Sequence, residues 1–76
     1  MLPLDQLRPG QCAEILSLPR DGPTVQRLME MGLMEGEHIE LIGFAPLGDP
    51  VEIRVGDYRL SLRRSEAARV LVQPRH

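Results

Sequence analysis

Hydrophobic and polar positions alternate most clearly over residues 51–62. Apolar residues occupy every second position of 51–55, and alternation resumes in 58–62 after Gly56-Asp57. Alternation with a period of two is typical of a strand with one buried face. Two turn residues, one of them glycine, between two such runs are typical of a tight hairpin. The pattern therefore predicts an antiparallel hairpin in which Arg54 lies opposite Arg59.

Three further strands are predicted from weaker patterns. Residues 11–18 are apolar towards their end, residues 38–44 alternate and then become apolar on both faces, and residues 69–72, an arginine followed by three apolar residues, are predicted as the last strand. Burial on both faces near the end of 38–44 favours a closed or strongly bent sheet. Residues 45–50 carry proline, glycine and proline at alternate positions and are predicted as a shaped loop, and residues 74–76 as a tail.

One short helix is predicted after the first strand. Pro23 suits the first helical position, where no N–H is needed, with Gly22 or Asp21 as the cap. Gly32 is expected to end the helix in a left-handed conformation. Three apolar residues recur between them at the spacing of one helix face, and we expect that face to lie on the core: Val25, Leu28 and Met29.

A single helical turn is predicted at residues 66–68, with Ser65 as its cap. The expected fold is mostly β: a small, strongly bent antiparallel barrel of about five strands, with one helix after the first strand and a helical turn before the last. Closure is how a small sheet removes its exposed edges. The chain of 76 residues has room for one domain, residues 1–76.

Composition mainly excludes partners. Aromatic residues make up 3% of the chain, the net charge is −2, and all nine basic residues are arginines. Single-stranded nucleic acid and proline-rich peptides both need aromatic surfaces, so neither is an expected partner. One cysteine, Cys12, indicates a reducing setting and is expected to pack as a small buried residue. Without a signal peptide or an apolar run of about 18 residues, the chain is expected in the cytoplasm.

No arrangement of residues resembles a catalytic motif, so we do not expect an enzyme. His38 and Glu40 could offer an imidazole and a carboxylate to a divalent ion from one strand face, and His76 at the chain end could bind zinc or nickel adventitiously. A solvated histidine is the favoured interpretation of His38. No cofactor is required, although a transition metal, Fe²⁺ or adventitious Zn²⁺, remains a hypothesis.

Two surfaces are candidates for binding a partner protein. An apolar patch at the helix end, formed by Met31, Leu33 and Met34, competes with assignment of these residues to the core. Exposed methionines and sheet edges also leave weak self-association open. The second candidate is a stripe of outward-facing arginines, for which Glu52 and Glu40 are the favoured internal partners: Arg54, Arg59 and Arg63.

The order of motifs along nearly the whole chain resembles the FeoA family. The specific pieces are Arg27-Leu28-x-x-Met31-Gly32-Leu33 and Ala45-Pro46-Leu47-Gly48-Asp49-Pro50. The resemblance implies an SH3-like barrel and a cytosolic accessory role in bacterial ferrous iron uptake. It also implies a partner, the membrane permease FeoB with its cytoplasmic GTP-binding domain, through which the chain would meet the membrane only peripherally.

The resemblance adds residues to the candidate docking surface, namely Arg27 in the helix motif and Pro46, Leu47 and Asp49 in the loop. One alternative is a metal-responsive module, since similar SH3-like domains end the iron-dependent repressors of the DtxR family. Another, ranked lowest, is stimulation of GTP hydrolysis by an inserted arginine.

Overall fold

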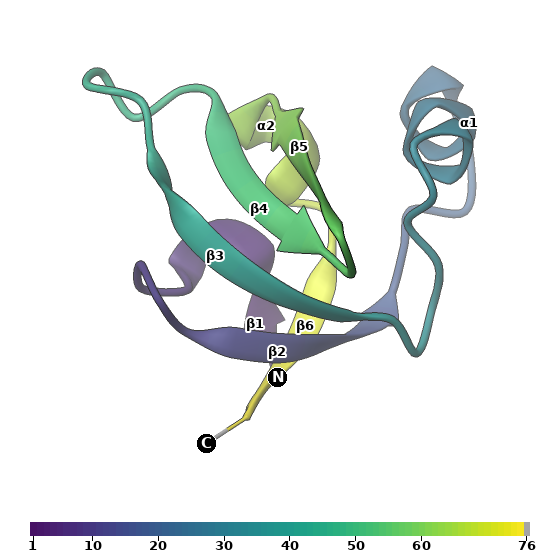
Figure 1. Ribbon diagram of the computed structural model, residues 1–76. Coiled ribbons are helices and arrows are strands. Elements are labelled where there is room, and N and C mark those ends of the chain that lie inside the picture. Colours follow the sequence, from purple (N-terminus) through teal and green to yellow (C-terminus); the bar gives the residue numbers. More distant parts are fainter. Residues whose placement is uncertain (76) are drawn as a thin grey trace.

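The computed structural model describes residues 1–75 and consists mainly of one curled β-sheet. Within these residues the strands form one six-stranded antiparallel sheet in the order β1-β6-β2-β3-β4-β5 (Figure 1). The elements follow one another as β1 (Leu2–Pro3), the 3₁₀ helix η1 (Leu4–Gln6), β2 (Cys12–Ser17), α1 (Pro23–Glu30), β3 (His38–Phe44), β4 (Val51–Val55), β5 (Tyr58–Leu62), α2 (Arg64–Ala67) and β6 (Leu71–Arg75).

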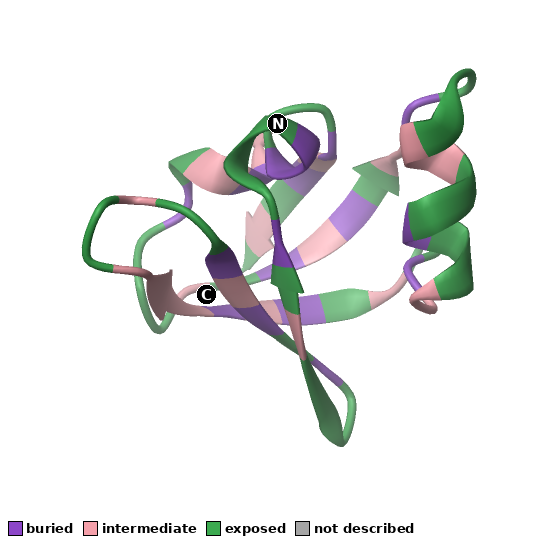
Figure 2. Cartoon of the chain, turned by 90° about the horizontal axis from the view of Figure 1, so that it is seen from above, coloured by how far each residue is buried: buried purple, intermediate pink, exposed green. Residues whose placement is uncertain are grey.

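The core lies inside the curl of the sheet. Buried residues alternate with more exposed ones along β2 and β4, as Figure 2 shows, because successive strand side chains point to opposite faces. The largest fully buried side chains come from the strands, from η1 and α1, and from the turn after α1: Leu4, Ile15, Leu28, Leu33, Leu41, Ile53 and Leu62. The predicted mostly-β fold, with one helix after its first long strand, is confirmed.

The hairpin has the predicted register. Val55 pairs with Tyr58, and Arg54 pairs with Arg59. β3 pairs with β4 on the other side, which places Glu40 opposite Arg54. The sheet therefore carries Glu40, Arg54 and Arg59 in one cross-strand row.

Helix α1 begins at Pro23 with Gly22 as its N-cap, as predicted. It ends in a Schellman motif: the Leu33 N–H donates to the Leu28 carbonyl at 3.1 Å, and Gly32 has φ +90°. The expected burial of Met29 is wrong, since Met29 is 60% exposed. In Figure 1, α1 stands beside the sheet rather than across it, so of its residues Leu28 alone is fully buried.

The last strand is longer than predicted, because β6 includes residues that the sequence assigns to a tail. Pro74 pairs with Ala13 of β2. Ile15, two residues further along β2, bonds through its N–H and C=O to residues 36–37. Ala13 has the same backbone orientation as Ile15, so its N–H and C=O also point towards β3 and away from β6. Pro74, opposite Ala13, therefore does not need an N–H to bond with β2.

Two smaller expectations are wrong, and two short elements are not predicted. Ser65 does not cap α2; the N-cap is Arg63, whose N–H donates to Glu66 Oε1 at 2.9 Å. Cys12 is exposed rather than packed inside, since it lies on the outer face of β2. Strand β1 and η1 were missed because so short a segment, Leu2–Gln6, has no measurable period.

Candidate functional site

An apolar groove separates α1 from the end of β2, with a cavity volume of about 410 Å³. We call it the α1 groove. Met29 and Met34 are its most exposed apolar residues, at 60% and 59%. The remaining lining is apolar with two charged residues: Leu18, Pro19, Arg20, Val25, Leu33 and Glu35.

The groove follows from how α1 is attached. Leu28 and Leu33 are fully buried and hold the helix end to the core, while Val25 and Met29 lie one step round the helix from Leu28 and face the gap. On that flank of α1, the side chains do not pack on the sheet. The sequence pattern alone does not show whether Val25 and Met29 line a groove or pack in the core, because apolar residues have the same helical period in both cases.

The residues of the predicted patch at the helix end differ in their exposure, and docking at this patch stays a prediction. Met34 is exposed and Met31 is half-buried. Leu33 is fully buried, so it belongs to the core and contributes the inner wall of the groove. The residues that the prediction missed are Val25 and Met29.

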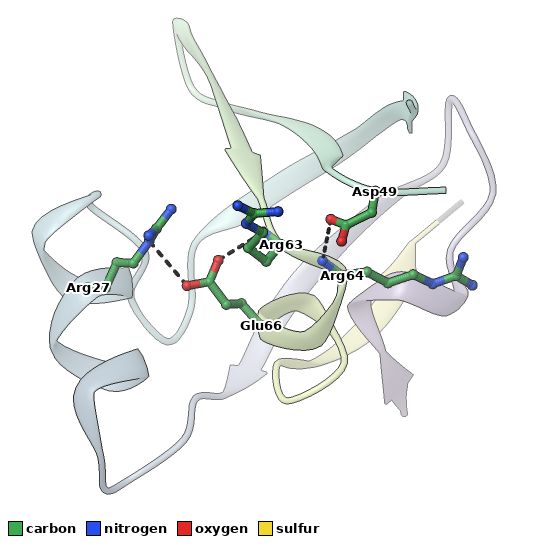
Figure 3. A network of polar contacts seen from close by, with 5 residues as sticks. All are labelled: Arg27, Asp49, Arg63, Arg64 and Glu66. Atoms are coloured by element: carbon green, nitrogen blue, oxygen red, sulfur yellow. Dashed lines mark hydrogen bonds and ion pairs between the residues drawn. The ribbon is translucent and has the colours of Figure 1, made fainter. Parts of the chain in front are cut away.

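A polar network lies on the other flank of α1 (Figure 3). Arg27 Nε lies 3.1 Å from Glu66 Oε2, and the second oxygen of Glu66 accepts the Arg63 N–H. Glu66 is 8% exposed, so both of its oxygens are satisfied where water has little access. Arg27 thus joins α1 to the start of α2.

The loop at residues 45–50 lies far from the α1 groove. In both Figure 1 and Figure 2 it projects on the side of the molecule opposite α1. Leu47 is 97% exposed at its tip, and Pro46 is exposed beside it. Asp49 has a structural task, because its Oδ1 accepts the Arg64 N–H at 3.0 Å and so caps α2.

Of the two favoured internal partners of the arginine stripe, Glu52 forms an ion pair, whereas Glu40 is a neighbour in the strand register alone. Arg59 Nη1 lies 4.0 Å from Glu52 Oε1, and Glu40 is opposite Arg54 across β3 and β4. Arg63 lies at the far end of β5, where it lines a separate depression with Arg27, Pro50 and Ser61. The three arginines consequently do not share one site.

The weak metal candidates lie on the outer face of the sheet. Pairing of β2 with β3 sets His38 opposite Glu14, and Glu40 opposite Cys12. Among residues 1–75, no group of three or more His, Cys, Asp or Glu side chains is arranged to hold a metal ion. His76 lies outside the described residues, and metal binding at His38 and Glu40 stays a prediction.

Glu14 is engaged by an arginine instead. Arg75 Nη2 of β6 donates to Glu14 Oε1. This hydrogen bond lowers the pKa of Glu14 below its ordinary value, against a smaller opposing effect of desolvation, and the charge of His38 adds a further small lowering. The pair ties β6 to β2 at the outer face.

No helix within residues 1–75 combines the length and the apolar character needed to span a bilayer. This agrees with the absence of long apolar runs in the sequence.

Comparisons with known proteins give a consistent result. A family model described as FeoA domain matches residues 2–74. A curated relative, the Fe(2+) transport protein A/Fe(2+) transporter FeoB fusion protein of Porphyromonas gingivalis, is 40% identical over 70 residues, which cover 92% of this chain and 8% of the relative.

Solved structures agree with the sequence comparison. Iron(II) transport protein A of Clostridium thermocellum has a TM-score of 0.88 and 38% identity, covering 95% of this chain and 44% of that one. The zinc complex of Stenotrophomonas maltophilia FeoA, described as an SH3 domain protein, has a TM-score of 0.77 and 31% identity, covering 96% and 91%. The expected SH3-like architecture is confirmed.

A manganese-dependent transcriptional repressor with bound manganese has the same fold at a TM-score of 0.88. Its identity is 11%, and the match covers 96% of this chain and 36% of the repressor. Similarity at that level establishes a common fold and nothing about ligands.

Proposed function

The chain belongs to the FeoA family, and on that premise we propose that it is an accessory protein of bacterial ferrous iron uptake that docks on the cytoplasmic GTPase region of FeoB. The observation that carries this proposal is the fusion protein, in which a domain 40% identical to this chain is joined to FeoB in one polypeptide. A linker keeps two domains at a high effective concentration, which favours their association. The chain corresponds to 8% of that protein, and in this proposal the transport activity belongs to the remainder.

The α1 groove is the surface best suited to the docking. Two methionines more than half exposed line a groove of about 410 Å³. Methionine is flexible and polarisable, so a methionine-lined groove adapts to an apolar side chain of a partner. Leu47 offers a second, smaller apolar contact in the loop at residues 45–50, which lies on the side of the molecule opposite α1.

The role is one of binding rather than catalysis. In this proposal the chain carries no reacting group of its own, requires no cofactor, and works in the cytoplasm, meeting the membrane only through FeoB. Fe²⁺ is the cargo of the transporter and not a resident ion of this domain.

Calorimetric titration of the full chain into the purified cytoplasmic region of FeoB, with and without a GTP analogue, tests the proposal. We expect saturable one-to-one binding in at least one nucleotide state. Absence of binding in every state would contradict it. Measuring GTP hydrolysis in the same mixtures checks the binding-only role, since a large rate increase would indicate an inserted arginine instead.

The alternative, a metal-responsive regulatory module, is favoured by the zinc complex of Stenotrophomonas maltophilia FeoA, which is 31% identical to this chain, whereas the manganese-dependent repressor shares the fold alone. It predicts that metal alone changes the protein. Saturable Fe²⁺ binding that His38→Ala reduces would favour it, whereas weak binding that depends on His76 would be adventitious.

A further inference from the structure

Two arginines from distant parts of the chain meet in the depression beside α1, which has a volume of about 310 Å³. Arg27 comes from α1 and Arg63 from the N-cap of α2, and Pro50 and Ser61 complete the lining. We call this depression the Arg27–Arg63 cleft. Both arginine side chains are exposed at its mouth.

The cleft is preorganised by one buried carboxylate. Glu66 uses Oε2 to hold Arg27 Nε at 3.1 Å and Oε1 to accept the Arg63 N–H at 2.9 Å. Arg27 engages Glu66 through Nε, which leaves its two terminal nitrogens as further donors. Glu66 also fixes the backbone of Arg63, while the guanidinium of Arg63 has no carboxylate within ion-pair distance among residues 1–75.

The net charge of the cleft favours a carboxylate over a phosphate as its ligand. The cleft residues together with Glu66 carry two guanidinium groups and one carboxylate, which leaves a single positive charge, and the Ser61 hydroxyl supplies a neutral donor. Glu52 lies opposite Ser61, but its charge is paired with Arg59. A carboxylate with one negative charge balances the cleft and suits the planar, bidentate geometry of arginine. A phosphate near −2 would leave an excess negative charge beside the nearly buried Glu66.

We propose that the Arg27–Arg63 cleft binds one carboxylate side chain, an Asp or Glu, of the partner protein. This inference rests on the proposed docking and names a chemical determinant of it. On α1, Arg27 lies on one side of the buried Leu28, and Val25 and Met29 lie on the other. A partner segment that crosses α1 can therefore place an apolar side chain in the α1 groove and a carboxylate in the cleft.

The first test compares Arg63→Gln with Arg54→Gln in the titration against the FeoB cytoplasmic region. Arg63→Gln keeps the backbone donor to Glu66 and removes the guanidinium, so we expect affinity to fall about tenfold. Arg54→Gln removes an exposed arginine that already faces Glu40, and we expect less than a twofold change. Equal effects of the two variants, with wild-type binding intact, would overturn the cleft and leave the docking proposal standing.

The second test needs no partner, so it separates failure of the cleft from failure of the docking. Acetate and inorganic phosphate are titrated into the isolated chain at matched ionic strength while the Arg Nε–Hε resonances are followed by NMR. We expect acetate to shift the Arg27 and Arg63 resonances, and Arg63→Gln to abolish the shift at Arg27. No acetate shift, or tighter binding of phosphate, would overturn the assignment to a carboxylate.

Discussion

Tyr58 lies so close to Gly32 that a Cβ on Gly32 would stand 2.4 Å from the Tyr58 hydroxyl oxygen. The same hydroxyl donates a hydrogen bond to the Met31 carbonyl at 3.2 Å. The start of β5 is thus packed on the turn that ends α1, although the two are far apart in sequence. This contact, with buried Leu28 and Leu33, sets where α1 stands and so defines the α1 groove.

Gly32→Ala should destabilise the fold for two reasons. Its φ of +90° disfavours any side chain, and the Cβ collides with Tyr58. Tyr58 is 45% exposed, so its ring can turn aside at the cost of its hydrogen bond to the Met31 carbonyl, and we expect the free energy of unfolding to fall by about 2–3 kcal/mol, measured by urea denaturation.

Gly36→Ala is the matched control for this prediction. Gly36 has the same φ of +90° but no atom within 4 Å of its Cβ position. It should lose about 1–2 kcal/mol, the conformational part alone. An equal loss in the two variants would show that the Tyr58 contact is unimportant.

The turn chemistry of the chain made most of the fold predictable. Gly56-Asp57 between two alternating runs predicted the register that places Arg54 opposite Arg59, and Pro23 and Gly32 predicted both ends of α1. Pairing between strands far apart in sequence left no such local signal. The inclusion of Pro74 in β6 depends on its orientation opposite Ala13, which only the assembled sheet determines.

Glu66 should be important for stability because it is nearly buried and satisfies two groups. Glu66→Ala leaves the Arg63 N–H and Arg27 without their acceptor, and we expect a loss of about 2 kcal/mol in the free energy of unfolding. Glu66→Gln keeps an oxygen for the Arg63 N–H and should lose about half as much.

Glu52→Gln is the control for the Glu66 variants. Glu52 makes an exposed pair with Arg59 at 4.0 Å, so the change should stay within about 0.5 kcal/mol. Thermal unfolding of the variants in parallel gives the comparison. A loss from Glu66→Ala no larger than that from Glu52→Gln would contradict the role assigned to Glu66.

The candidate site was less predictable than the fold, for a physical reason. Met29 and Leu28 belong to one apolar stripe in the sequence. Met29 is exposed and Leu28 is buried because α1 lies beside the sheet rather than across it. Arg63 was predicted to continue the stripe of Arg54 and Arg59. Its proximity to Arg27 arises from the packing of α1 near α2, which no local pattern encodes.

The pKa of Glu14 should rise toward its ordinary value in Arg75→Gln, because the hydrogen bond from Arg75 is the largest cause of its lowering. A carboxyl NMR titration measures this directly. Arg69→Gln is the control, since Arg69 pairs with Asp21 and should leave Glu14 unchanged. A Glu14 pKa that is the same in all three proteins would contradict the assignment.

The contribution of the Glu14–Arg75 pair to the free energy of unfolding should also depend on pH. The folded-state pKa lies below the unfolded-state value, so the pair stabilises the fold above the ordinary glutamate pKa. That contribution is lost as the pH falls through the lowered folded-state value. Arg75→Gln should therefore reduce the acid sensitivity of unfolding in this range, whereas Arg69→Gln should not.

Met29→Gln and Met34→Gln should separate docking from stability. Both side chains are more than half exposed, so we expect the free energy of unfolding to change by no more than about 0.5 kcal/mol. Each removes apolar surface from the α1 groove, and affinity for the cytoplasmic region of FeoB should fall about tenfold in calorimetric titrations.

Leu47→Gln is the matched control for the groove, because Leu47 is 97% exposed and belongs to the loop at residues 45–50, which projects on the side of the molecule opposite α1. It should change the affinity less than twofold if the groove is the main contact. A larger loss from Leu47→Gln than from either methionine variant would assign docking to the loop at residues 45–50. Since all three changes replace an exposed apolar side chain with glutamine, the order of their effects identifies the docking surface without a structure of the complex.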